Sequence, residues 1–351
     1  MTKKCTICRM RGSSQRQGTV LCLALSVDED REPSPVFPEE VREEMKLIKK
    51  LLIIVASVVG IILAAVILLR PYFLNITFGI SDFFRDFGLK APDDVFQVKD
   101  QRYGDDSMQV FDVYYPVGTE SALPTIVSLH GGGYTYGTKE TYQYYCMNLA
   151  QRGFTVVNYS YRLGPKHKFP AQIEDTNTVM DVICKNAEKY HIDTNNIFFV
   201  GDSAGGHLNA QYSAAVTNPE YAALLGLDIP RFTLRATALN CGVFDVKDAA
   251  SGQMKYILEG DPSQYEEKWD ICGHITTDFP PAFVMSSTGD MCLPYAEPMY
   301  NLLTEKGIEA ELHIYGDDQN KLPHVFHINI RNSFAEQCND EECAFFEKFV
   351  E

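Results

Sequence analysis

The pentapeptide Gly201-Asp202-Ser203-Ala204-Gly205 places a serine between two glycines in the pattern G-x-S-x-G. An apolar run at residues 197–200 precedes it, and a stretch that favours helix begins at His207. A strand that turns sharply into a helix leaves little room for Cβ atoms, so the flanking glycines force the serine out to a reacting face. The pattern predicts that Ser203 is a nucleophile, which needs a base, an acid and an oxyanion hole.

A second glycine string, His130-Gly131-Gly132-Gly133, directly follows an apolar run at residues 125–129. Successive glycines allow backbone N–H groups to approach a substrate closely, which is how main chain builds an oxyanion hole. A flexible glycine turn is the alternative. The interval up to Ser203 has room for one more strand, a helix and the nucleophile strand, which is the order that this chemistry uses.

These motifs resemble those of the hormone-sensitive-lipase-like family of α/β-hydrolases. The resemblance extends to Tyr161-Arg162-Leu163, Phe169-Pro170-Ala171 and Asp175, and it covers about residues 95–351. It implies an α/β-hydrolase fold, with a mostly parallel eight-stranded sheet, helices on both faces and a small helical cap. It also implies hydrolysis of carboxylic esters and a structural hydrogen-bonding role for Asp175.

The same resemblance implies three backbone donors for the oxyanion hole, the N–H groups of Gly131, Gly132 and Ala204. Geometry supports Ala204 independently, because its N–H lies at the positive N-terminus of the helix that follows the nucleophile. We expect Asp202 to fix the turn, and His207 to be a helix residue packed near the sheet.

The base must be a histidine that follows the nucleophile, because the chain order in this fold is serine, acid, histidine. His324 follows a predicted strand at residues 310–315 by a loop, and it precedes a helical C-terminus. His313 lies within that strand, and His327 is the rival three residues beyond His324. The family also has a histidine followed by a small or apolar residue and phenylalanine, which His324-Val325-Phe326 matches.

The acid is expected at the carboxyl end of a neighbouring strand. Asp290 follows the buried-strand pattern of residues 281–287, where a loop carboxylate can reach His324. The family usually has proline and leucine soon after this aspartate, and here the order is Met291-Cys292-Leu293-Pro294. Asp245, after a strand at residues 233–243, is the alternative acid. The predicted triad is Ser203, His324 and Asp290.

Alternating strand and helix patterns predict a single α/β unit from residue 95 to residue 351. Helical stretches at residues 141–152, 170–190 and 297–306 separate strand candidates, so the middle strands should be parallel. The first two strands look like a hairpin. The strand candidates are residues 95–100, 109–115, 125–130, 155–161, 197–201, 233–242, 282–287 and 310–315.

Residues 51–69 contain no charged residue and are bounded by Lys49-Lys50 and Arg70-Pro71. At about 1.5 Å per residue, such a segment can cross about 30 Å of hydrocarbon. A cleaved secretory signal is the alternative. It would have a shorter apolar centre, and no small-residue cleavage site follows before Arg70. We expect a single-pass transmembrane anchor over residues 45–70. Lysine and arginine are denser before the span, which predicts a cytoplasmic N-terminus and an extracytoplasmic or lumenal catalytic domain.

The remaining segments leave alternatives open. Residues 1–44 are either a disordered tail or an extension upstream of a true start at Met45. Residues 71–94 are either part of a cap over the pocket or a membrane-hugging amphipathic helix. The family's second cap piece corresponds to residues 245–279, and Asn75-Ile76-Thr77 fits a glycosylation sequon.

The charge of the domain limits its possible binding partners, and its cysteine count limits the possible disulfides. Of 31 Lys and Arg and 47 Asp and Glu, 11 and 8 precede residue 71, which leaves 20 against 39 and a net charge of −19. Such a domain would be repelled by nucleic acid and by anionic lipid. Its seven cysteines leave at least one unpaired, and an external disulfide is an open alternative. No motif requires a cofactor or a metal ion, and the oligomeric state cannot be inferred from the sequence.

The sequence thus predicts a membrane-anchored serine hydrolase that cleaves small or medium apolar acyl esters through an acyl-enzyme intermediate. Two alternatives remain. One is a catalytically inactive homologue that binds a ligand or a protein, and the other is a peptidase or amidase on the same fold. A complete set of serine, acid and histidine argues against the first.

Overall fold

The computed structural model describes residues 38–69, 73–244 and 256–351, and its contacts divide the chain into two units, Met1–Leu68 and Leu69–Glu351. Helix α1 (Glu39–Leu69) makes up the described part of the first unit. Its segment Glu39–Val66 is long and apolar enough to cross a membrane, judged by length and composition.

Helix α1 begins earlier than the expected anchor boundary at residue 45. Glu39 and Glu40 form its first turn directly after Pro38, and negative charge there is favourable to the helix dipole. Residues 39–44 are therefore helical, although they were expected in a disordered tail. Residues 1–37 of that tail lie outside the described residues.

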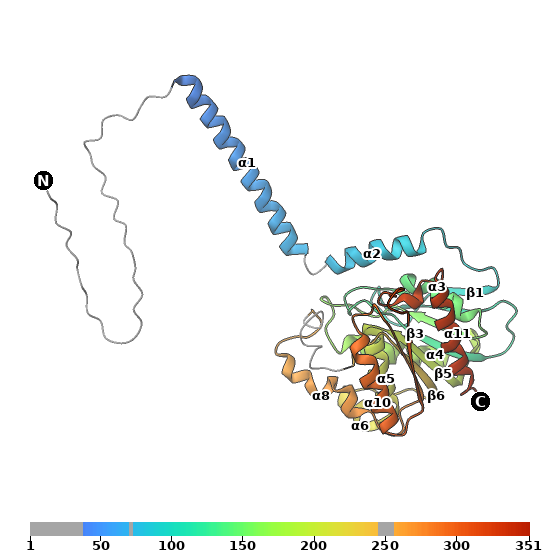
Figure 1. The fold of residues 1–351 in the computed structure, drawn as a ribbon. Coiled ribbons are helices and arrows are strands. Elements are labelled where there is room, and N and C mark those ends of the chain that lie inside the picture. The colour runs from blue at the N-terminus through green and yellow to red at the C-terminus, as the bar shows by residue number, and fades with distance from the viewer. Residues whose placement is uncertain (1–37, 70–72, 245–255) are drawn as a thin grey trace, which may run out of the picture. The chain divides into compact units, whose positions relative to one another are not determined.

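The second unit is built on one eight-stranded sheet with the order β1-β2-β4-β3-β5-β6-β7-β8 (Figure 1). β2 pairs antiparallel with both β1 and β4, and every other neighbouring pair is parallel. This confirms the predicted mostly parallel sheet. The strands are β1 (Val95–Arg102), β2 (Val110–Pro116), β3 (Leu123–Leu129), β4 (Thr155–Tyr159), β5 (Ile192–Asp202), β6 (Leu234–Asn240), β7 (Ala282–Ser287) and β8 (Ala310–Tyr315).

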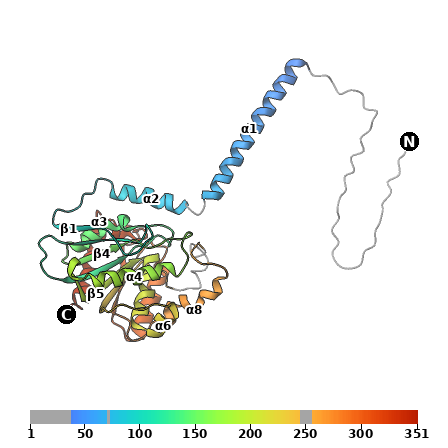
Figure 2. The same cartoon turned by 180° about the vertical axis from the view of Figure 1, so that it is seen from behind.

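Helices cover both faces of this sheet (Figure 2). Side chains alternate between the two faces along each strand, as on β5, where Phe198 stacks on Phe346 of the C-terminal helix and Phe199 lies against Tyr212 of the helix that follows β5. The predicted site residues therefore follow strands of a sheet that is covered on both faces. The helix bounds are α2 (Phe73–Asp86), α3 (Lys139–Ala150), α4 (Ala171–Lys185), α5 (Ala204–Thr217), α6 (Pro219–Leu225), α10 (Leu293–Glu305) and α11 (Ser333–Glu347), with short 3-10 helices η2 (Glu188–Tyr190) and η5 (Phe326–Ile328).

The expected strand bounds are correct for β7 and β8 and differ elsewhere. β5 begins at Ile192, earlier than residue 197, because Ile192 pairs with Leu123 across a register shift. β4 ends at Tyr159, and Tyr161 lies buried beyond the strand with its hydroxyl donating to the His130 carbonyl at 2.7 Å.

Short helices follow β6 in the region expected to form the second cap piece. The part of it at residues 245–255 lies outside the described residues. Trp269 is buried there, with its ring 5.3 Å from that of His207 and 5.4 Å from that of Phe169. The segment thus packs against the first turn of α5. Its helices are η4 (Pro262–Tyr265), α8 (Glu266–Trp269) and α9 (Ile271–His274).

Candidate active site

Ser203 occupies the sharp turn between β5 and α5. Its φ of 54° and ψ of −119° belong to neither strand nor helix, and a residue with a side chain is strained there. The Ser203 N–H donates to the Asn240 carbonyl at 3.0 Å, which ties the turn to the end of β6. Ser203 is only partly buried. This is the elbow geometry that the G-x-S-x-G pattern predicts.

Gly205 shows why the elbow needs glycine. A Cβ on Gly205 would lie 2.0 Å from the Leu129 carbonyl oxygen and 2.6 Å from that of His130. Because no side chain fits there, the first turn of α5 can pack directly against the end of β3. That contact brings the Ala204 N–H to the sheet edge where the glycine string begins.

His324 and Asp290 meet as predicted. Nδ1 of His324 lies 2.5 Å from Oδ1 of Asp290. Asp290 follows β7 and His324 follows β8, while Ser203 follows β5, so all three lie at the carboxyl edge of the parallel strands. The His324 side chain is 18% exposed, which leaves the imidazole accessible from solvent.

Asp290 is held in place by further donors. Ser286 Oγ donates to Oδ2 at 2.7 Å, and the Cys292 N–H donates to Oδ1 at 2.8 Å. Burial alone would raise the pKa of Asp290, but the hydrogen bond and charge of His324 and the Cys292 N–H hold it below its ordinary value. The ionised carboxylate is suited to orient the imidazole. Asp245, the alternative acid, lies outside the described residues.

The other candidate histidines have different surroundings. His313 lies in β8, as expected. His327 is buried with its ring edge-on to that of Tyr145 at 5.2 Å, and burial lowers its pKa to about 3. His207 lies in α5 with Nδ1 2.8 Å from Tyr134 Oη, and burial lowers its pKa to about 4. His207 and His327 are buried against tyrosine rings, whereas His313 contacts the carboxylates of Glu311 and Glu341.

The glycine string differs from expectation at one donor. The Gly131 N–H, which we expected in the oxyanion hole, donates to Tyr142 Oη at 3.0 Å and is engaged inside the protein. Gly132 and Gly133 follow with φ values of 108° and 59°, which favour glycine. Among described residues, the N–H groups of Gly132, Gly133 and Ala204 have no hydrogen-bond acceptor. These three donors are free to bind a substrate oxygen.

Asp202 joins the elbow to the glycine string. Tyr142 Oη donates to Asp202 Oδ2 at 2.7 Å, and a Cβ on Gly131 would lie 2.9 Å from that same oxygen. Burial raises the pKa of Asp202 to about 7. Asp202 fixes the turn, as expected, but it does so through Tyr142, which no sequence motif identifies.

Glu342 of α11 is a second buried acid that the sequence analysis missed. It accepts hydrogen bonds from Tyr145 Oη at 3.0 Å and from Asn240 Nδ2 at 2.6 Å. Burial raises the pKa of Glu342 to about 7. Since the Asn240 carbonyl accepts the Ser203 N–H, Glu342 supports the strand end that holds the nucleophile. Its position among apolar residues on one face of the predicted C-terminal helix was the only available signal.

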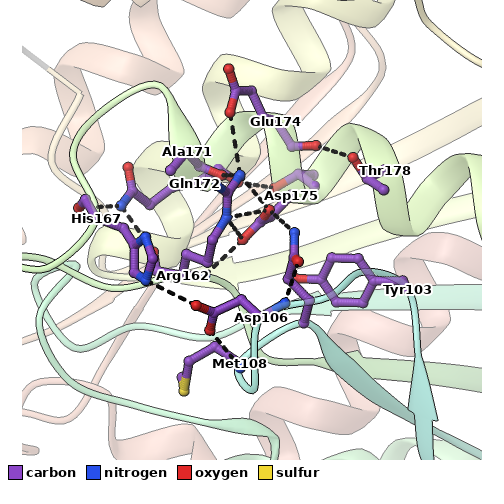
Figure 3. Close-up of polar contacts among 12 residues, drawn as sticks. Tyr103, Asp106, Met108, Arg162, His167, Ala171, Gln172, Glu174, Asp175 and Thr178 are labelled. Carbon is purple, nitrogen blue, oxygen red and sulfur yellow. Dashed lines mark hydrogen bonds and ion pairs between the residues drawn. The ribbon is translucent and has the colours of Figure 1, made fainter.

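Arg162 and Asp175 form the structural network that the resemblance implies (Figure 3). The backbone N–H of Arg162 donates to Asp175 Oδ2 at 2.7 Å and its Nε to Oδ1 at 2.9 Å. Gln109 Nε2 donates to the same Oδ1 at 2.7 Å, and Gln172 Nε2 to the Arg162 carbonyl at 2.9 Å. The fully buried Asp175 thus joins the residue that precedes β2, the loop after β4 and helix α4.

Cys241 lies beside the acid and base, and donor atoms of Cys241, Asp290 and His324 are within 4.8 Å of one another. Burial, followed by the charge of Asp290, raises the pKa of the Cys241 thiol well above its ordinary value. The thiol therefore stays protonated and is no competing nucleophile. All seven described cysteines are free thiols, so no disulfide forms among the described residues.

Comparison with known proteins places the chain in a family. A family profile described as BD-FAE matches residues 111–302, which is more than half of the chain. The chain belongs to the BD-FAE family. The match includes the glycine string, the serine elbow and Asp290, while His324 lies beyond it. Together with the relatives below, the BD-FAE match confirms the resemblance to hormone-sensitive-lipase-like α/β-hydrolases.

Relatives of this BD-FAE family member include proteins named as ester hydrolases. Esterase LipC of Mycobacterium tuberculosis is 33% identical over 126 residues, covering 35% of this chain and 31% of LipC. Ethyl acetate hydrolase of Pseudomonas putida is 33% identical over 153 residues, covering 42% of this chain and 46% of that protein. The chain thus spans less than half the length of these relatives.

A solved structure shows the same fold. The crystal structure of an inhibited esterase B from Lactobacillus rhamnosis superposes with a TM-score of 0.75. It is 22% identical in sequence, and the alignment covers 80% of this chain and 96% of esterase B.

Proposed function

We propose that this BD-FAE family member is a serine hydrolase of carboxylic esters. The observation that carries the proposal is the His324–Asp290 hydrogen bond at the sheet edge where Ser203 occupies its strained turn. The esterase names of LipC and ethyl acetate hydrolase support the same class of reaction.

In the proposed first half-reaction, Ser203 Oγ attacks the ester carbonyl carbon while His324 takes the hydroxyl proton. Asp290 orients the imidazole and stabilises its positive charge. The carbonyl oxygen becomes an oxyanion that accepts hydrogen bonds from the N–H groups of Gly132, Gly133 and Ala204. This set replaces Gly131 by Gly133, because Tyr142 occupies the Gly131 N–H.

Collapse of the tetrahedral intermediate breaks the ester C–O bond. The imidazolium of His324 gives its proton to the leaving alkoxide, so an alcohol departs and an acyl group remains on Ser203. Water then attacks the acyl carbon, with His324 again as base. The products are the carboxylic acid and the free serine, and the proton balance is restored.

We infer that the substrates are small or medium apolar acyl esters. The name of the Pseudomonas putida relative, ethyl acetate hydrolase, supports a short acyl group. The test is a panel of nitrophenyl esters from acetate to palmitate with the full chain in detergent. We expect the highest kcat/KM at the shorter chains. A maximum of kcat/KM at palmitate would contradict the proposed acyl chain length. Failure to hydrolyse any of the esters would contradict the proposed esterase activity.

The same panel, extended with anilides, distinguishes the two alternatives, an amidase or peptidase and a binding protein without catalysis. Nitroanilides of the same acyl groups test an amidase or peptidase, since the leaving group is then an amine. Faster turnover of the anilides would favour that alternative. A binding protein without catalysis would leave every ester and anilide intact. The His324–Asp290 hydrogen bond argues against this alternative, because binding alone does not require it.

We further propose that α1 is a single-pass transmembrane anchor with its N-terminus in the cytoplasm. The support is the uncharged run of residues 51–69 within this helix, together with Arg42, Lys46, Lys49 and Lys50 before that run. Protease treatment of intact membrane vesicles of known sidedness tests the orientation. Protection of the catalytic domain in vesicles whose lumen corresponds to the extracytoplasmic side agrees with the proposal, and its digestion there contradicts it.

A further inference from the structure

Helix α2 (Phe73–Asp86) has an apolar stripe on its outer surface. Five large apolar side chains there are between 50% and 69% exposed, in a part of the chain where a soluble helix would present polar groups. The five are Ile76, Ile80, Phe83, Phe84 and Phe87.

Their spacing places them on one side of the helix. Residues 76, 80, 83, 84 and 87 follow the i, i+4, i+7, i+8, i+11 pattern, which at 3.6 residues per turn makes a single narrow stripe. Phe87 continues the helical turn, since its N–H donates to the Phe83 carbonyl at 2.9 Å. No charged residue lies within the stripe.

Polar residues of α2 face the hydrolase domain instead. Asn75 Nδ2 donates to the Thr135 carbonyl at 2.9 Å, and Asp82 accepts from Tyr136 Oη at 2.6 Å. Thr135 and Tyr136 belong to the loop that follows the glycine string. The bond at Asn75 also occupies the amide of the glycosylation sequon.

Arg85 completes this inward attachment. Its guanidinium donates to the Thr141 carbonyl at 2.6 Å and pairs with Asp82 and Asp86, each at 2.7 Å. The Arg85 side chain is only 10% exposed. These bonds fix the rotation of α2 about its axis, so the apolar stripe must point away from the domain.

The chain itself indicates what covers the stripe. Only residues 70–72 separate Phe73 from Leu69, the last residue of α1. At about 3.5 Å per residue, the start of α2 stays within about 14 Å of the end of that apolar helix. When α1 spans a bilayer, α2 therefore begins at the bilayer surface. Interfacial helices bury an apolar face about 5–10 Å into the boundary between headgroups and acyl chains.

We propose that α2 is an interfacial helix whose stripe of Ile76, Ile80, Phe83, Phe84 and Phe87 inserts into the bilayer surface and docks the hydrolase domain on the membrane. The proposal rests on the membrane span of α1, and it is independent of the proposed esterase activity. Because the domain carries a net charge of −19, the docking depends on apolar contact, and a zwitterionic bilayer is its partner.

The test uses tryptophan fluorescence, since the chain has one tryptophan and Trp269 is buried. Full-length Phe84→Trp is reconstituted in phosphatidylcholine vesicles, with or without bromine on the upper part of the acyl chains. We expect brominated lipid to quench this fluorescence about twofold, because bromine reaches a side chain inserted about 5–10 Å deep. Phe83→Trp, on the same stripe, provides a second site in case one variant fails to fold.

Val350→Trp is the matched control. Val350 is exposed, and Glu351 next to it bonds Asn196, which lies in the half of β5 that is farther from Ser203. Fluorescence of this variant should be unchanged by bromine. Flotation of all variants with the vesicles verifies the α1 anchor separately.

Three results overturn the proposal. The first is flotation of the protein with no quenching at residues 83 and 84. The second is equal quenching at residue 350, which would show that no particular face docks. The third is a blue-shifted Phe84→Trp spectrum in detergent together with cross-linked dimers and no quenching in vesicles. That result would assign the stripe to a second copy of the chain.

Discussion

The hydroxyl of Tyr142 donates to the carboxyl group of Asp202 across 2.7 Å, directly beside the nucleophile Ser203. The same hydroxyl accepts the Gly131 N–H at 3.0 Å. One side chain from helix α3 therefore joins the nucleophile turn to the glycine string that supplies the proposed oxyanion donors.

Removing this hydroxyl should weaken catalysis more than substrate binding. In Tyr142→Phe the Asp202 carboxyl loses a donor and the Gly131 N–H loses its acceptor, so the glycine string is less well positioned. We expect kcat to fall about tenfold, which corresponds to about 1.4 kcal/mol of transition-state stabilisation, with KM nearly unchanged. Steady-state kinetics on nitrophenyl acetate measures both.

Tyr144→Phe is the matched control for that variant. Tyr144 lies on the same helix, and its hydroxyl donates to the Leu89 carbonyl at 3.1 Å instead. Its kcat should stay near that of the wild type. Equal losses in both variants, or a loss that appears only in KM, would contradict the positioning role of Tyr142.

The two histidines of the C-terminal loop should differ sharply. His324→Asn removes the base that bonds Asp290, and we expect kcat to fall by about 10³-fold or more. His327→Asn changes a buried packing residue, so it should lower stability while the folded fraction retains most of its kcat. Kinetics normalised to folded protein by near-UV circular dichroism makes the comparison. A larger loss of kcat in His327→Asn would favour the rival base.

The buried acid Glu342 should make stability depend on pH. Its pKa rises from 4.5 to about 7 in the folded protein, so the folded state binds the proton more tightly than the unfolded state. The free energy of unfolding therefore falls as pH rises from about 4.5 to 7, by at most about 3 kcal/mol. Glu342→Gln removes this titration.

Urea denaturation in detergent at pH 4 and pH 8 measures the effect of that variant. We expect Glu342→Gln to be more stable than the wild type at pH 8 and to show no gain at pH 4, where both forms are uncharged. An equal gain at both pH values would mean that packing, and not ionisation, causes the difference.

The Arg162–Asp175 network should support the fold without taking part in catalysis. Asp175→Ala leaves the Arg162 guanidinium and the Gln109 amide without their shared acceptor, and we expect a loss of about 3 kcal/mol in unfolding free energy. Glu174→Gln is the control, because Glu174 bonds the same arginine from a half-exposed position and should cost below about 1 kcal/mol. A drop in kcat of folded Asp175→Ala would assign the network a catalytic role.

Local sequence motifs predict the structure correctly where a few adjacent residues determine the backbone conformation. The elbow at Ser203 depends on the glycines beside it, and β7 and β8 show their bounds as uninterrupted strand patterns. The pairing of Asp290 with His324 followed from chain order, since the carboxyl ends of parallel strands share one edge.

Contacts between distant elements could not be read in this way. Tyr142, which lies in helix α3, accepts the hydrogen bond of the Gly131 N–H, and nothing in the glycine string itself predicts that contact. Likewise, the raised pKa values of Asp202 and Glu342 come from burial by helices far away in the sequence. The outward direction of the apolar stripe of α2 follows from the hydrogen bonds that Asn75, Asp82 and Arg85 make to the hydrolase domain, and these bonds could not be predicted from the sequence.

We propose that His324 activates Ser203 as a nucleophile. A fluorophosphonate that phosphonylates active serines, followed by peptide mass spectrometry of the full-length protein, tests this role of Ser203. We predict a single adduct on the peptide that contains Ser203 in the wild type, a strongly slowed reaction in His324→Asn and none in Ser203→Ala. An unlabelled wild type, or equal labelling of Ser203→Ala, would show that Ser203 is not the nucleophile.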